Sequence, residues 1–121
     1  MKMKKSLMLF LVGVGLSTAV QAKDAKCKIT FNNEVVVNNS SCSFSSIDGD
    51  GSFILNSKYG FYADIEAFKV EIIDKGVART YVSGGDGTWN DWGKAIRSKS
   101  QPACWNGKAG STKYQICAFA K

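Results

Sequence analysis

The most regular feature of this chain is a series of short segments in which apolar and polar residues alternate. Turns rich in Gly, Asn and Asp separate these segments, and such alternation is typical of strands with one buried face. The segments predicted as strands are residues 28–31, 34–37, 42–44, 52–55, 77–83, 95–98 and the two arms of a hairpin within 104–118. Many short strands predict an all-β fold, a small antiparallel β-sandwich or barrel.

Three stretches interrupt this pattern. Residues 38–41 are predicted as a polar turn, and residues 84–94 as a Gly-rich loop. Within residues 61–74 the large apolar side chains recur at helical spacing, yet residues 69–72 alternate as a strand does. Two strands meeting at residues 66–67 are expected here. One helix near 61–74, which would make the fold α+β, is the alternative.

The N-terminal 22 residues follow a different pattern. A start rich in Lys, of a kind that bacterial exported proteins carry, precedes a continuous apolar and small-residue run that ends in Val20-Gln21-Ala22. This predicts a secretory signal peptide over residues 1–22, followed by a single β domain over 23–121 in the periplasm or outside the cell. The run is shorter than the roughly 20 apolar residues that a span needs, so no membrane span is predicted.

All four cysteines lie after the predicted cleavage point, and an even count in a small exported domain predicts two disulfides. If the last hairpin turns at residues 110–111, Cys104 faces Cys117 directly, with Cβ atoms ~4.5–5.5 Å apart. That separation is close to what a disulfide requires, so we expect Cys104 to pair with Cys117. By elimination, Cys27 pairs with Cys42.

The chain contains no His, which removes nucleophile–His pairs, His general bases and the usual zinc ligands. Cysteines held in disulfides do not act as thiol nucleophiles. The remaining carboxylate pairs stand in predicted turns or on solvated strand faces, so a non-enzymatic protein is expected. Residues 48–52 resemble a calcium loop only in composition, because the Gly and Glu of an EF-hand are missing at positions 6 and 12. No metal and no cofactor are predicted.

Charge is unevenly distributed along the chain. Without the predicted signal peptide, 13 basic and 10 acidic residues remain, a net charge of +3. The last 28 residues hold six basic residues and no acidic one. These cations are either ordinary solvated side chains or a contact face for an acidic cleft or a polyanion. The small net charge and the exported compartment argue against a nucleic acid as partner.

Residues 83–94 are the most distinctive segment, with four glycines and two of the three tryptophans. Aromatic anchors and cations beside a Gly-rich loop are typical of a recognition surface. Trp105 is expected in the core, whereas Trp89 and Trp92 are either core residues or surface anchors. The predicted binding residues are Ser83, Gly84, Asp86, Trp89, Trp92, Lys94 and Arg97.

Taken with the signal peptide and the cysteines near both ends, Ser-Gly at residues 83–84 and Trp-Gly-Lys-Ala at residues 92–95 carry a family resemblance. The chain resembles the periplasmic and membrane-bound inhibitors of c-type lysozyme. The resemblance implies a small β-barrel that inserts a loop into the lysozyme cleft, where a Ser and a Lys approach the catalytic carboxylates. Two differences from that family are the absence of a Tyr after Ser-Gly and the reversed order of Lys and Gly.

The function expected first is an inhibitor or immunity protein that occludes the active site of a cell-wall-cleaving enzyme, such as a lysozyme or a peptidoglycan-cleaving toxin. Lys94 or Arg97 would approach the carboxylates of the target, and Ser83 would form a hydrogen bond. Trp89 or Trp92 would pack on the wall of the cleft. The alternatives are a carbohydrate- or surface-binding module that stacks these tryptophans on sugar rings, and a structural envelope or secreted component.

Overall fold

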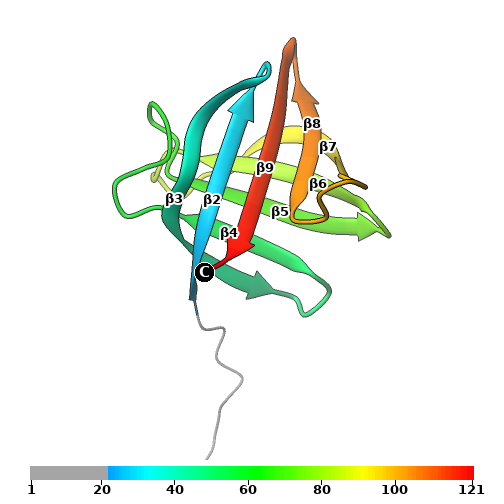
Figure 1. Ribbon diagram of the computed structural model, residues 1–121, viewed down its shortest axis with the longest axis horizontal. Coiled ribbons are helices and arrows are strands. Elements are labelled where there is room, and N and C mark those ends of the chain that lie inside the picture. Colours follow the sequence, from blue (N-terminus) through cyan, green and yellow to red (C-terminus); the bar gives the residue numbers. More distant parts are fainter. Residues whose placement is uncertain (1–21) are drawn as a thin grey trace, which may run out of the picture.

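A computed structural model describes residues 22–121, which form a closed antiparallel barrel of eight strands (Figure 1). The strands are β2 (Lys23–Phe31), β3 (Glu34–Ile47), β4 (Ser52–Asn56), β5 (Ala67–Asp74), β6 (Val77–Ser83), β7 (Asn90–Arg97), β8 (Cys104–Ala109) and β9 (Thr112–Ala120). Each strand pairs with its neighbours in sequence, and β2 pairs with β9 to close the barrel. The all-β prediction is confirmed, in its barrel form.

The N-terminal prediction cannot be followed in the structure, because residues 1–21 of the predicted signal peptide lie outside the described residues. Within residues 22–121, the structure has no helix of the length and apolar character that crossing a membrane requires.

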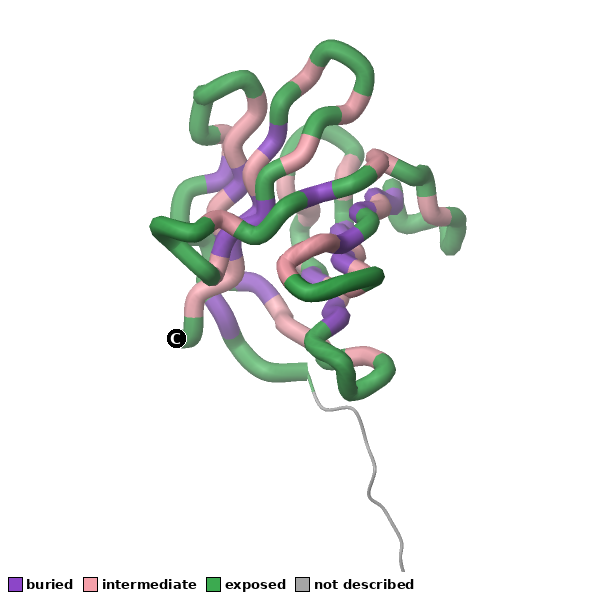
Figure 2. The backbone as a smooth tube through the Cα atoms, turned by 90° about the vertical axis from the view of Figure 1, so that its right-hand side faces the viewer, coloured by how far each residue is buried: buried purple, intermediate pink, exposed green. Residues whose placement is uncertain are grey.

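The strand order places the connections at two opposite ends of the barrel. The loop end carries the connections 32–33, 57–66, 84–89 and 110–111. The terminal end carries the connections 48–51, 75–76 and 98–103, the start of β2 and the C-terminus. Figure 2 shows that exposed residues are concentrated in the connections, while buried residues lie along the strands.

Apolar side chains from all eight strands fill the barrel. They include Ile29, Val37, Leu55, Phe68, Val70, Ala78, Val82, Ala95, Trp105, Tyr114 and Ile116. Trp105 is 3% exposed, which confirms its predicted place in the core. Because these residues alternate with exposed ones, the period of two that predicted the strands also fills the interior.

The predicted turn at 38–41 is wrong, because β3 runs through these residues as one strand of 14 residues. Its first part pairs with β2 and its last residues pair with β4. Register shifts on either side of Ile29 mark irregularities in the β2–β3 ladder, and Asn39 has a φ of 53°. Bulges bend a strand without ending it, so the polar residues here mark a bend instead of a turn.

Residues 61–74 form neither a helix nor two strands. β5 begins only at Ala67, and the preceding connection is irregular apart from an isolated bridge between Tyr62 and Ile65. Positive φ angles of 83° at Gly60 and 52° at Ala63 are incompatible with a right-handed helix. The apparent helical spacing has another cause. Phe61 and Ile65 of the connection pack against the core, and Phe68 and Ile72 of β5 follow them at the same spacing.

The predicted loop 84–94 is also shorter in the structure, since β7 already begins at Asn90. Arg79 pairs with Lys94 whereas Tyr81 pairs with Asp91, so β7 carries one extra residue opposite β6. Gly93, with a φ of 84°, lies in this bulge, where a positive φ favours glycine. A glycine that indicated a loop therefore belongs to a bulged strand.

The last hairpin has the predicted register. Cys104 faces Cys117, and the remaining pairs continue to Ala109 opposite Thr112. Both predicted disulfides, Cys27–Cys42 and Cys104–Cys117, are present. Two disulfides indicate an oxidising compartment.

Candidate functional site

An aromatic cluster closes the barrel at its loop end. The ring of Trp92 has its centroid 5.7 Å from that of Phe31, 5.5 Å from Tyr114 and 6.2 Å from Phe68. Tyr62 packs edge-on against Phe31, with 5.7 Å between the ring centroids. Aromatic pairs of this kind stabilise a structure beyond the area they bury. The cluster therefore gives the connections above it a firm base.

Tyr114 ties this cluster to the barrel wall. Its hydroxyl donates a hydrogen bond of 3.1 Å to the backbone oxygen of Trp92. Burial raises the pKa of the Tyr114 phenol, which keeps it protonated as a donor. The neighbouring Thr80 hydroxyl lowers the pKa of Tyr114 and so opposes the effect of burial. The Thr80 hydroxyl is itself buried and has no hydrogen bond of good geometry to any described residue.

The connection 57–66 presents a well-defined tip at this end. The Ser57 hydroxyl donates to the backbone oxygen of Gly60 at 2.8 Å, and the Gly60 N–H donates to the Ser57 oxygen at 3.1 Å. Lys58 and Tyr59 form the corner of this turn, which we call the Lys58–Tyr59 tip. Tyr59 is 89% exposed, and the Nζ of Lys58 lies 5.5 Å from its ring centroid.

Two apolar side chains anchor the same connection to the barrel. Phe61 and Ile65 pack against the core, and the Phe61 ring lies 5.3 Å from that of Phe68. The Phe61 N–H donates to the Ile65 oxygen at 2.7 Å, and the Ile65 N–H donates to the Tyr62 oxygen at 2.9 Å. A loop held in this way loses little conformational entropy when a partner binds it.

The connection 84–89 lies against the base of 57–66. The Glu66 N–H donates to the Ser83 oxygen at 2.9 Å. A Cβ at Gly84 would lie 3.2 Å from the backbone oxygen of Asp64, and a Cβ at Gly85 would overlap the Glu66 carboxylate. The two glycines therefore permit a close approach, and the two connections form one continuous surface.

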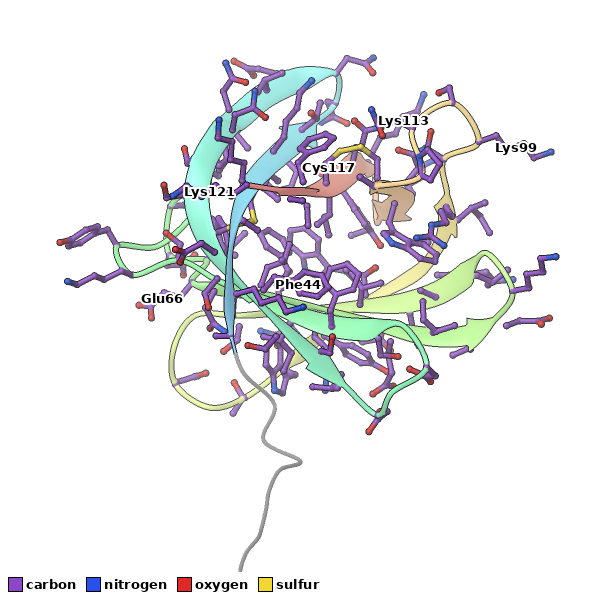
Figure 3. The ribbon with its side chains drawn as sticks, turned by 60° about the horizontal axis from the view of Figure 1, so that its bottom comes forward. Phe44, Glu66, Lys99, Lys113, Cys117 and Lys121 are labelled. Atoms are coloured by element: carbon purple, nitrogen blue, oxygen red, sulfur yellow. A yellow bond between two sulfur atoms is a disulfide. The ribbon has the colours of Figure 1, made fainter. Side chains whose placement is uncertain are left out.

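The two connections carry three exposed carboxylates, those of Asp64, Glu66 and Asp86. Figure 3 shows Glu66 projecting outward, on the opposite side of the molecule from Lys99 in that view. Asp86 accepts hydrogen bonds from the hydroxyl and the N–H of Thr88, which hold its pKa below the ordinary value. Among the described residues, no group of three His, Cys, Asp or Glu side chains is arranged to hold a metal ion.

The seven predicted binding residues lie in several different environments. Gly84 and Asp86 belong to the loop end. Ser83 is only 5% exposed, and its hydroxyl accepts a hydrogen bond of 3.2 Å from the Gly85 N–H, so it shapes the loop from beneath. Trp92 belongs to the aromatic cluster and supports this end from within.

Trp89, Lys94 and Arg97 lie elsewhere. The Nζ of Lys69 on the outer wall lies 4.9 Å from the ring centroid of Trp89 and 4.7 Å from that of Tyr81. Lys94 pairs in register with a residue of β6 and is exposed on the same wall. Arg97 ends β7 at the terminal end of the barrel. The structure thus brings Gly84 and Asp86 together, while Arg97 lies at the opposite end.

The basic residues of the last quarter of the chain do not share one face either. Lys108 and Lys113 face each other across the last hairpin near the loop end. Lys99 and Lys121 lie at the terminal end, and Figure 3 shows them on opposite sides of the view. The charge asymmetry of the sequence is therefore divided between both ends of the barrel.

Lys58 and Tyr59 are the residues that sequence reasoning missed. The segment around them looked like a break between strands, ending at Gly60. The available signal was an aromatic residue inside a Ser-x-x-Gly turn, where burial of a large side chain is not expected. Which turn residues reach solvent depends on the anchors Phe61 and Ile65, which local sequence does not reveal.

Residues 22–121 contain one ion pair, on the outer wall. The Nε of Arg79 lies 2.7 Å from Oδ2 of Asp91, and both side chains are 45% exposed. The hydrogen bond from Arg79 holds the pKa of Asp91 below its ordinary value, and the Gly93 N–H adds a second hydrogen bond of 2.7 Å. An exposed pair of this kind contributes little to stability on its own.

These carboxylates predict how stability depends on pH. Asp50, Asp86 and Asp91 all have a pKa below the ordinary 3.8 in the folded state, chiefly through hydrogen bonds from Ser52, Thr88 and Arg79. Their stabilising effect is complete above the unfolded pKa and is lost as pH falls through the lowered folded pKa. Since the chain has no His, the urea midpoint should stay constant between about pH 5 and 8 and decrease below about pH 4. A midpoint that changes between pH 8 and 5 would contradict this prediction.

Comparison with known proteins finds no relative of this chain. No family model, no curated protein and no solved structure matches the chain. Inference about function therefore proceeds from the geometry of the barrel ends.

Proposed function

We propose that this protein is an exported inhibitor or immunity protein that uses its loop end to occlude the active site of a cell-wall-cleaving enzyme. The observation that carries the proposal is the Lys58–Tyr59 tip, where an 89% exposed Tyr stands beside a cation on an anchored loop. Tyr supplies a large, rigid contact area at a low cost in conformational entropy. Aromatic anchors of this type contribute most of the energy in many protein interfaces.

The chemistry of the tip suits a catalytic cleft. Glycosidases that cleave sugar polymers use a pair of carboxylates beside the scissile bond. Lys58 brings an ammonium group to such carboxylates, while Tyr59 packs on the apolar wall that normally contacts a sugar ring. The ion pair strengthens the complex only when both groups are hydrogen-bonded as they lose water, which an inserted tip arranges.

The carboxylates of the two connections extend the complementarity. Asp64, Glu66 and Asp86 are exposed in the two connections together with a single Lys, so these connections are acidic apart from the basic tip. An enzyme that acts on an anionic cell-wall polymer gains from a basic surface around an acidic cleft, the inverse of this pattern. Lys58 takes the role that the sequence assigned to Lys94 or Arg97.

The compartment fits this partner. Two disulfides in a small barrel support a periplasmic or secreted location, where cell-wall-cleaving enzymes act. The signal peptide expected at residues 1–22 supports the same location. A non-enzymatic role is part of the proposal. The Thr88 hydroxyl at the loop end donates to the Asp86 carboxylate two residues away, a contact that closes an exposed turn, and the chain holds no His to act as a general base.

A protein partner is favoured over a glycan that stacks on tryptophan. The ring of Trp92 packs against Phe31 and Tyr114 in the aromatic cluster, while Trp89 lies against Lys69 on the outer wall. The two tryptophans therefore do not form one platform for successive sugar rings.

Substitutions at the tip test the proposal. With a c-type lysozyme as the probe, Tyr59→Ala is expected to weaken binding about 30-fold, the effect of losing an interface anchor worth roughly 2 kcal/mol. Lys58→Ala should weaken binding about tenfold and reduce its dependence on salt. Calorimetric titration measures the affinity, and hydrolysis of peptidoglycan measures the inhibition.

Matched controls come from the rest of the barrel. Ile96→Ala removes a side chain that is 50% exposed on the outer wall, and Lys75→Ala removes a cation from the terminal end. Both should bind as the unmodified protein does. If neither lysozyme nor any of a panel of glycosidases and amidases is bound, the proposal fails.

A further inference from the structure

The terminal end of the barrel opens into an apolar hollow of about 440 Å³. Its lining includes Phe44, Phe53, Trp105, Pro102, Ala118 and Arg97. Figure 3 is turned so that this end comes forward, and it labels Phe44 and the nearby Lys121. The volume lies in the range of sites that hold small organic molecules, and the mouth of a β-barrel is a common place for them.

The walls of this hollow are preformed. The rings of Phe44 and Phe53 stack with 4.9 Å between their centroids and 23° between their planes. Phe53 is 6% exposed and Trp105 is 3% exposed, so core packing fixes both side chains. Phe53 and Trp105 therefore form a fixed floor, and the partly exposed Phe44 is the aromatic side chain that a ligand in the hollow contacts.

One charged side chain, Arg97, stands in this lining. Its Nε donates a hydrogen bond of 2.8 Å to the backbone oxygen of Pro102, and its Cζ lies 5.4 Å from the ring centroid of Trp105. Within residues 22–121 the single ion pair joins Arg79 and Asp91, so no carboxylate of the described chain neutralises Arg97. The bond to Pro102 uses Nε and leaves the two terminal nitrogens, which suit a bidentate carboxylate.

A second hollow continues the first. It has a volume of about 450 Å³ and shares Phe44 and Ala118 with the first hollow. Its charged lining residues are Lys23, Asp24 and Lys121, and Ala25 and Phe119 are among the apolar ones. The two hollows adjoin at Phe44 and Ala118, and Arg97 lines the first.

We propose that the terminal end binds an amphipathic carboxylate with a linear apolar chain. Arg97 holds the carboxylate, and the chain lies over Phe44 and Ala118 toward the second hollow. Burial of the chain supplies the affinity, and the guanidinium selects an anionic head group. This site lies at the opposite end of the barrel from the Lys58–Tyr59 tip, so it stands apart from the proposed function.

Three probes with the same apolar chain and different head groups test the site in the purified protein: dodecanoate, dodecanol and dodecyltrimethylammonium, each below its micellar concentration. Titration followed by calorimetry and by tryptophan fluorescence should show dodecanoate binding at least about tenfold more tightly than either other probe. Equal affinity for the three would overturn the proposal, as would binding of none.

A pair of substitutions on β7 locates the selectivity. Arg97→Gln keeps a polar side chain at an exposed position and should remove the preference for dodecanoate. Lys94→Gln removes a cation from the same strand on the outer wall and should leave that preference intact. A preference that survives Arg97→Gln would place the carboxylate elsewhere and overturn the assignment.

Discussion

Replacing Gly107 with alanine is expected to destabilise the barrel by about 2–3 kcal/mol, the cost of an overpacked core position. Gly107 pairs with Tyr114 across β8 and β9, and a Cβ at this position would overlap the phenol ring. That ring is 3% exposed and is tied to the backbone oxygen of Trp92, so it cannot move aside freely. Alanine ordinarily stabilises a strand relative to glycine by about 0.5–1 kcal/mol, which is smaller than the steric cost.

Urea unfolding of matched variants isolates this overlap. Lys108→Ala, at the exposed neighbouring position, should change the free energy of unfolding by less than about 0.5 kcal/mol. In a Tyr114→Ala background, the additional change Gly107→Ala should cost almost nothing, because the ring it would meet is gone. Strictly additive effects of the two substitutions would show that the overlap does not determine the role of Gly107.

Removing the disulfide between Cys27 and Cys42 with paired alanine substitutions is expected to lower the free energy of unfolding by more than about 3 kcal/mol. The bridge joins residues 15 apart in sequence, and closing a loop of this length contributes about 3 kcal/mol by restricting the unfolded chain. Both sulfurs lie in the core cluster, so alanine also leaves a cavity. The bridge joins diagonal positions of the β2–β3 ladder, next to the register shift that follows Cys27.

The second disulfide provides the comparison. Cys104 and Cys117 are 13 residues apart and directly opposed in a regular hairpin, and both are buried, at 3% and 1% exposed. Their replacement by alanine should also cost more than about 3 kcal/mol, because the loop is of similar length and a cavity is left here too. Chemical denaturation under non-reducing conditions measures both effects. Equal stability of the Cys27/Cys42 variant and the unmodified protein would rule out this role for the bridge.

Local sequence was sufficient where the structure is local. The turn at residues 110–111 fixes the register of the last hairpin, and that register alone places Cys104 opposite Cys117. Local sequence could not distinguish a bulge within a strand from a turn, because the same residue types favour both. Asn39 and Gly93 both have positive φ, as turn residues do, yet each lies within a strand whose partners come from elsewhere in the chain.

The candidate site shows the same limit. Lys94 and Arg97 are three residues apart in β7, and an odd separation directs them to opposite sides of the barrel wall. The sequence pattern predicts Lys94 in a loop over 84–94 and Arg97 in a strand over 95–98, which does not reveal this difference in direction. Ser83 is buried because β6 continues to that residue, and Tyr59 is exposed because neighbouring residues anchor its loop. Side-chain exposure at the loop end depends on barrel closure, which no single segment encodes.

Hydrogen exchange in the presence and absence of a bound c-type lysozyme tests most directly whether the loop end is the contact surface. The backbone amides of residues 57–66 and 84–86 should become protected in the complex. Amides facing the terminal end should exchange as they do in the free protein. Protection confined to the terminal end or to the outer wall would contradict an inhibitor that acts through the Lys58–Tyr59 tip.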